Sequence, residues 1–140
     1  MLVETLEGVD RLERRPQDHG QATYAPKLRK EDGHLDWSRE ASDIDRRVRA
    51  FTPWPSAFTG FRGRRLIVLG GRMGSEDSGG MPAGAILSRG REGLEVACGR
   101  GTYIVERLQP ENKGPMSAYD FSLGARIKEG ERLEAYSSKM

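Results

Sequence analysis

Arginine is the side chain through which this sequence most visibly offers chemistry. From residue 46 to residue 72 the chain carries no acidic side chain, and it carries seven arginines: Arg46, Arg47, Arg49, Arg62, Arg64, Arg65 and Arg72. The planar guanidinium group binds phosphate oxygens through two parallel hydrogen bonds, so such a stretch suits contact with a nucleic-acid backbone. An ordinary solvated face, with its acids elsewhere in the fold, fits equally well, because the net charge of the chain is only +2.

Other reactive side chains lack the partners that their chemistry needs. His19 and His34 stand in loop-like contexts without cysteine, histidine or carboxylate at metal-ligand spacing, so we expect no metal site. Nucleophile elbows, His–Cys pairs and readable carboxylate pairs are absent from the sequence. The single cysteine, Cys98, follows Val96 and Ala97 and is typical of a small strand residue in a reducing compartment. We therefore predict no catalytic residue in this chain.

Composition indicates one domain, or one domain with an extension. Hydrophobic residues make up 36% of the chain and charged residues 31%, which permits a modest core. Eighteen glycines and seven prolines indicate many turns and short elements. No stretch has the apolar length of a membrane span, and the N-terminus lacks a signal-peptide pattern, so we expect a cytoplasmic location and no membrane partner.

Apolar spacing predicts the helices that position these side chains. Residues 1–14 have the pattern of an amphipathic helix, whose apolar stripe needs a surface on which to dock. A second helix has three apolar residues on one face: Ile44, Val48 and Phe51. Arg46 and Arg49 project away from that face, and Ser42 and Asp45 have the spacing of a capping box at its start.

Glycine-bounded apolar stretches predict about five short strands, at residues 57–61, 65–69, 84–88, 94–98 and 102–108. Arg62 and Gly63 form the turn after the first strand, and the glycine-rich residues 70–84 form a mobile loop that lacks a phosphate-binding pattern. A short helix runs from Ser117 to Gly124, and Leu133 ends a last short strand. Many short strands separated by glycines are typical of a small barrel or sandwich.

The segment that joins the second helix to the strands contains an unusual tryptophan. Pro53 and Pro55 end the helix, and each pushes the residue before it toward extended backbone, so Trp54 lies on a stiff piece of chain. A ring held in this way usually packs, which predicts that Trp54 is a core anchor. The alternative is an exposed platform on which a nucleic-acid base stacks.

Two runs of residues carry a family resemblance. Residues 49–57 read Arg-Ala-Phe-Thr-Pro-Trp-Pro-Ser-Ala, and residues 21–28 read Gln-Ala-Thr-Tyr-Ala-Pro-Lys-Leu. The earlier run is followed by Lys30-Glu31-Asp32-Gly33 and by Asp36-Trp37. In this order and spacing the runs resemble the C-terminal domain of the methionyl-tRNA formyltransferases and the linker that leads into it. The resemblance extends from the first helix to about Leu133.

The resemblance implies a fold and a domain organisation. The fold is mainly β with short helices, a small open β-barrel like the OB-fold. Residues 1–14 correspond to the terminal helix of a preceding catalytic domain, residues 15–37 to the interdomain linker and residues 38–140 to the C-terminal barrel domain. We therefore expect this chain to be a fragment whose catalytic domain is missing.

The resemblance also implies a function. The family transfers a formyl group from 10-formyltetrahydrofolate to the methionine of initiator methionyl-tRNA in translation initiation, and its catalytic residues and folate pocket lie in the N-terminal domain. We expect the fragment alone to bind no cofactor, to be inactive, and to have initiator methionyl-tRNA and the missing N-terminal catalytic domain as partners. The tRNA-binding candidates are basic side chains: Lys27, Arg29, Lys30, Arg46, Arg49, Arg62, Arg64 and Arg65.

Two alternatives stay open. The chain can be the equivalent domain of a related formyltransferase that acts on a nucleotide-sugar amine or on formyltetrahydrofolate, which need not bind RNA. It can also be an interaction domain whose basic face is incidental.

Overall fold

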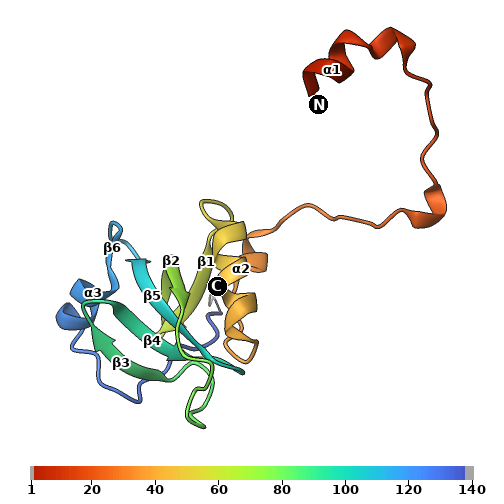
Figure 1. The fold of residues 1–140 in the computed structure, drawn as a ribbon. Helices are drawn as coiled ribbons and strands as arrows, with labels where there is room; N and C mark the ends of the chain where they lie inside the picture. Colours follow the sequence, from red (N-terminus) through yellow and green to blue (C-terminus); the bar gives the residue numbers. More distant parts are fainter. Residues whose placement is uncertain (1, 138–140) are drawn as a thin grey trace.

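Antiparallel pairing joins six short strands into one curved sheet (Figure 1). The computed structural model describes residues 2–137. The strands are β1 (Ala57–Phe61), β2 (Arg64–Met73), β3 (Ile86–Gly90), β4 (Gly93–Ala97), β5 (Thr102–Pro110) and β6 (Met116–Ser117). Their order is β1-β2-β5-β4-β3, and β6 pairs with β5 on the same edge as β4, further along the strand. The predicted mainly β fold, a small open barrel, is confirmed.

The C-terminal segment, residues 131–134, lies between the two edges of the sheet, β1 and β3. Gly60 of β1 exchanges backbone hydrogen bonds with Glu134, each 2.8 Å long. Leu133 donates to the carbonyl of Gly84, and Ile86 at the start of β3 donates to the carbonyl of Glu131. This segment forms isolated bridges instead of the predicted last strand, and it covers backbone groups that an open sheet would expose.

Two helices pack on this sheet. Helix α2 (Ala41–Phe51) buries Ile44 and Val48, as their spacing predicts. The predicted capping box is wrong, because the N-cap is Glu40, two residues before Ser42, which places Ser42 inside the helix. Helix α3 (Ala118–Gly124) follows its prediction, and the Ser117 hydroxyl accepts the amide N–H of Asp120 at 3.0 Å.

The core contains a different tryptophan from the predicted one. Trp54 is 57% exposed, so its prediction as a core anchor is wrong. The turn that carries it closes on itself: Ser56 donates its amide N–H to Phe51 and its hydroxyl to Pro53, each at 2.8 Å, which leaves the ring outside. Trp37, only 4% exposed, packs in the core, and its indole N–H donates to the Thr59 hydroxyl at 3.0 Å.

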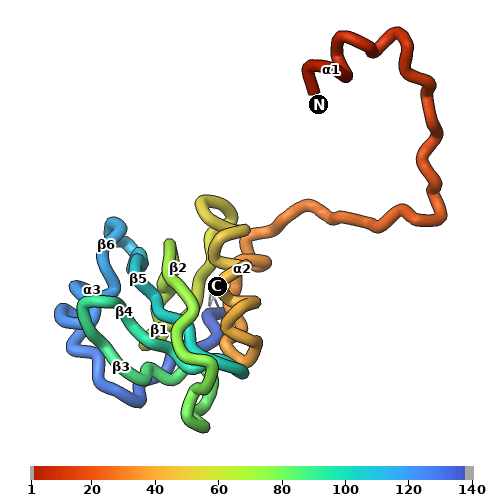
Figure 2. The backbone as a smooth tube through the Cα atoms, in the orientation of Figure 1, coloured from red at the N-terminus to blue at the C-terminus, as the bar shows by residue number. Residues whose placement is uncertain are grey.

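The N-terminal part of the chain runs away from the barrel (Figures 1 and 2). Helix α1 (Leu2–Glu7) is shorter than the predicted helix over residues 1–14, and three short 3-10 helices follow it: Val9–Arg11, His19–Gln21 and Lys30–Gly33. The apolar side chains of the first segment are all exposed, Leu2 by 73%. The barrel packing begins before residue 38, because Leu35 is already in the core. No helix among residues 2–137 has the length and apolarity to cross a membrane.

Candidate nucleic-acid interface

The structure places the eight predicted RNA-binding side chains in three groups. Lys27, Arg29 and Lys30 lie exposed on the linker and its last 3-10 helix. Arg46 and Arg49 lie on the outer face of α2, and the remaining three, Arg62, Arg64 and Arg65, lie at the turn from β1 to β2.

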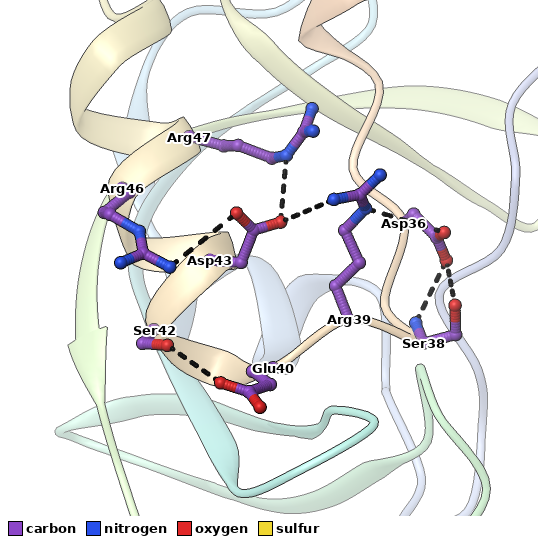
Figure 3. Close-up of polar contacts among 8 residues, drawn as sticks. All are labelled: Asp36, Ser38, Arg39, Glu40, Ser42, Asp43, Arg46 and Arg47. Atoms are coloured by element: carbon purple, nitrogen blue, oxygen red, sulfur yellow. Dashed lines mark hydrogen bonds and ion pairs between the residues drawn. The ribbon is translucent and has the colours of Figure 1, made fainter.

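On α2, acidic neighbours compensate the arginines. Asp43 lies among three guanidinium groups, with Arg47 Nε at 3.1 Å, Arg39 Nη1 at 3.3 Å and Arg46 Nη2 at 3.9 Å (Figure 3). Burial raises the pKa of Asp43, but the hydrogen bonds and charges of Arg47 and Arg39 outweigh it and hold that pKa below its ordinary value. Asp43 is therefore a carboxylate at neutral pH, and it offsets one of the three positive charges around it.

A similar pair holds Arg49, whose Nε lies 3.0 Å from Asp45 Oδ2 one helical turn earlier. The acid-free stretch begins at residue 46, so both acids that compensate α2 lie just before it in the sequence. The interpretation as an ordinary solvated face therefore describes α2 better than phosphate contact does.

Arg62 is fixed by contacts inside the protein. Its guanidinium forms a bidentate pair with Glu131, both hydrogen bonds being 2.9 Å, and donates to the carbonyl of Ala125 at 2.8 Å. It also lies over the ring of Phe61, 4.7 Å from the centroid. The amide N–H of Lys128 and then Arg62 hold the pKa of Glu131 below its ordinary value. Arg62 thus joins the β1–β2 turn to the C-terminal segment.

Arg64 and Arg65 have no acidic partner within the described part of the chain. Arg64 is exposed. Arg65 is half-buried, its guanidinium lies 4.4 Å from the centroid of the Phe58 ring, and its Nε is buried without a hydrogen-bond partner. These two side chains are available for an external anion.

Two adjacent hollows connect these cations. The turn pocket, of about 240 Å³, is lined by Phe61, Arg62, Arg64, Arg65, Leu66, Pro110, Glu111, Lys113, Phe121 and Ala125. The linker hollow, of about 350 Å³, is lined by Lys30, Glu31, Phe58, Arg65, Glu111 and Tyr136. Arg65 and Glu111 line both, so Lys30 of the linker and the β1–β2 turn belong to one surface.

Sequence reasoning missed Lys113, Pro110 and Phe121. Lys113 stands in the turn between β5 and β6, and nothing near it in the sequence connects it to the arginines. The sheet register makes the connection: Leu66 pairs with Pro110, and Glu111 donates its amide N–H to the carbonyl of Arg65 at 3.1 Å. Only the antiparallel pairing of β2 with β5 brings these two turns together.

The histidines and the cysteine show no reactive arrangement. The Nε2 atom of His34 accepts the amide N–H of Tyr136 at 3.1 Å, which occupies its lone pair. Among residues 2–137 no three His, Cys, Asp or Glu side chains cluster as a metal site would require. Burial raises the pKa of the Cys98 thiol to about 12, so it stays protonated at neutral pH.

Comparison with known proteins decides the family. The family described as "Formyl transferase, C-terminal domain" matches residues 27–126. The chain belongs to this family. The formyl transferase C-terminal domain therefore includes the last part of the linker, the barrel and helix α3.

The curated relatives of this domain are longer than the chain. It is 42% identical over 135 residues to a methionyl-tRNA formyltransferase of Roseiflexus castenholzii, covering 95% of this chain and 43% of the relative. It is 43% identical over 134 residues to that of Geotalea uraniireducens, covering 94% of this chain and 42% of the relative. The chain thus spans less than half the length of these relatives.

Solved structures support the fold. The structure of HypX from Aquifex aeolicus in complex with tetrahydrofolic acid matches with a TM-score of 0.63 at 16% identity, covering 97% of this chain and 26% of that protein. At this identity the likeness bears on the fold alone.

Proposed function

We propose that this chain is the tRNA-binding C-terminal part of a methionyl-tRNA formyltransferase. In translation initiation such an enzyme formylates initiator methionyl-tRNA with 10-formyltetrahydrofolate. The observation that carries the proposal is the 42% identity over 95% of the chain to a protein of that name. The turn pocket and the linker hollow add support, because their rims carry Lys30, Arg64 and Lys113, which have no acidic partner within residues 2–137.

The chain alone binds RNA and does not transfer the formyl group. The described residues offer no activated nucleophile, since the Cys98 thiol is buried and protonated and His34 accepts a backbone N–H through Nε2. The catalytic groups and the folate site belong to an N-terminal domain, which is the second partner of this chain.

The cations contribute unequally to binding. Arg46 and Arg49 share their charge with Asp43 and Asp45, whereas Lys30 and Arg64 have no acidic partner among the described residues. Backbone contacts of this kind position an RNA without reading its sequence, so initiator and elongator tRNAs bind the isolated chain alike. Affinity is modest, about 10⁻⁴–10⁻⁶ M near physiological salt, and falls steeply as salt rises.

A matched pair of double variants tests this proposal. Lys30→Gln with Arg64→Gln and Arg46→Gln with Arg49→Gln each remove two positive charges, and we expect the first pair to weaken binding to either tRNA more strongly. Fluorescence anisotropy of labelled tRNA across a salt series measures both effects. Absence of salt-dependent binding to any tRNA at about 10⁻⁴ M would refute the RNA-binding role. Formation of formyl-methionine by this chain, supplied with the formyl donor and methionyl-tRNA, would refute the assignment of catalysis to an N-terminal domain.

A further inference from the structure

We propose that the turn pocket holds the base of one unpaired nucleotide of an RNA strand, with the adjoining phosphate on Arg64 and Lys113. This inference rests on the proposed function and deepens it. It names the part of the RNA that the barrel recognises.

The walls of the turn pocket suit a flat apolar ligand. Phe61 and Phe121 meet edge to face, with ring centroids 5.8 Å apart and planes inclined by 70°. Leu66, Pro110 and Ala125 add further apolar surface. Phe61 is buried and Phe121 is partly exposed, so Phe121 is the ring that a base can reach. An aromatic side chain binds any nucleobase by its face, which gives a stacking site without strict sequence choice.

The pocket is preformed on the side of Arg62. Glu131 and the carbonyl of Ala125 hold the Arg62 guanidinium over the Phe61 ring, so this wall does not have to be ordered when a ligand enters. A preformed wall lowers the entropic cost of binding. Because Glu131 compensates its charge, Arg62 acts as part of the wall and the phosphate falls to other cations.

The volume of the turn pocket selects a single ring system. Its 240 Å³ lies below the roughly 300–1,000 Å³ of sites that enclose a drug-sized molecule. A folate or a nucleotide sugar has several linked groups and exceeds this space, whereas one nucleobase does not. The small volume therefore fits one base, and the remaining nucleotides of an RNA lie outside the pocket.

The rim supplies the charge for a phosphate next to that ring. Arg64 and Lys113 are exposed and unpaired among residues 2–137, and Arg65 lies between the turn pocket and the linker hollow. Of the described residues, Glu111 is the one acid that lines the turn pocket. A planar apolar group with a phosphate beside it is a nucleotide, and only an unpaired nucleotide can present its base, since bases within a duplex are stacked.

Two RNA hairpins of equal charge test this inference on the unmodified chain. They are identical except that the single bulged position carries adenosine in one and an abasic residue in the other. We expect the base-bearing hairpin to bind about fivefold tighter or better. Phe121→Leu removes the ring while keeping an apolar side chain, so it abolishes the difference in affinity between the two hairpins.

Cation variants check the phosphate contact. Arg64→Gln and Lys113→Gln each weaken the base-bearing hairpin several-fold. Arg100→Gln removes the same charge from a residue just before β5 begins, roughly 25 Å along the strand from the end that borders the pocket. It leaves the affinity for the base-bearing hairpin nearly unchanged. Thermal melts confirm that each variant is folded, and the comparison of the two hairpins on the unmodified chain needs no variant at all.

The outcomes separate this inference from the proposed function. Equal affinity for the two hairpins overturns the base pocket while salt-dependent tRNA binding still supports the proposed function. Absence of any RNA binding by the unmodified chain overturns both the base pocket and the proposed function. Adenosine monophosphate that displaces the base-bearing hairpin at equal concentration identifies a free nucleotide as the ligand and overturns the RNA source.

Discussion

The two tryptophans of this chain make opposite predictions about stability. Trp37→Ala removes a ring that is 4% exposed, and the loss of a buried ring of this size costs about 3–5 kcal/mol. It also removes the donor to the Thr59 hydroxyl, which adds up to about 1 kcal/mol. Trp54→Ala removes a ring that is 57% exposed, so less than half of its surface loses contacts, and we expect a cost of roughly 1–2 kcal/mol.

Urea unfolding followed by far-UV circular dichroism measures this difference. For a domain of this size the free energy of unfolding falls by about 1–3 kcal/mol per molar urea. The midpoint is therefore expected to fall by roughly 2 M in Trp37→Ala and by less than about 1 M in Trp54→Ala. Fluorescence is unsuitable for the alanine comparison, because each variant removes one of the two tryptophans.

Fluorescence is instead the control on single-tryptophan variants that keep a ring at each site. In Trp37→Phe only Trp54 emits, and acrylamide should quench it strongly. In Trp54→Phe only Trp37 emits, and it should be protected until the protein unfolds. A Trp54→Ala variant that loses as much stability as Trp37→Ala would refute the assignment of the core tryptophan.

Three further predictions concern single side chains. Folding lowers the pKa of Glu131, so its contribution to stability is present above its ordinary value of 4.5 and is lost as pH falls through the folded value. The Glu131→Gln variant lacks this carboxylate. In acid denaturation it should therefore lose less stability than the native chain over that pH range. Cys98 is buried and its pKa is raised to about 12, so at pH 8 iodoacetamide should label the thiol only after unfolding. Mass spectrometry measures the labelling, and rapid labelling of the folded chain would contradict the burial. Gly33→Ala places a methyl group against the carbonyl of Ser56, so the melting temperature should fall clearly, whereas Gly114→Ala, at a site with open space, should leave it nearly unchanged.

The sequence predicted those parts of the fold that depend on local pattern. The strands around residues 57–61 and 102–108 and the helix after Ser117 lie where their apolar spacing and capping residue place them. The glycine-rich loop began too early in the prediction, because β2 continues through Gly70 and Gly71 to Met73. A side chain at Gly71 would collide with the carbonyl of Ile104, so this glycine permits a close approach between strands and does not interrupt one.

The candidate site was less predictable because long-range pairing assembles it. Arg62 and Glu131 are 69 residues apart, and no local pattern connects them. Both Trp37 and Trp54 follow turn-forming residues, and only the complete barrel determines which ring is enclosed. The cations of the β1–β2 turn were found from the sequence, but part of the apolar wall that gives them a pocket comes from β5 and α3, through Pro110 and Phe121.

The charge available to an RNA is smaller than the arginine count indicates. Of the seven arginines between residues 46 and 72, five lie within 4 Å of an acidic oxygen: Arg46, Arg47, Arg49, Arg62 and Arg72. Their acids all lie outside that stretch, at Asp43, Asp45, Glu92, Glu106 and Glu131, so a count within the stretch misses every one of them. An ion pair must break or be shared before its arginine binds phosphate fully. We therefore expect Arg64 and Arg65 to contribute most per residue to RNA binding, together with Lys30 and Lys113 on the same surface. A surface with so few free cations gives modest affinity by charge alone, and an aromatic pocket at its centre is the means by which it can hold one nucleotide in place.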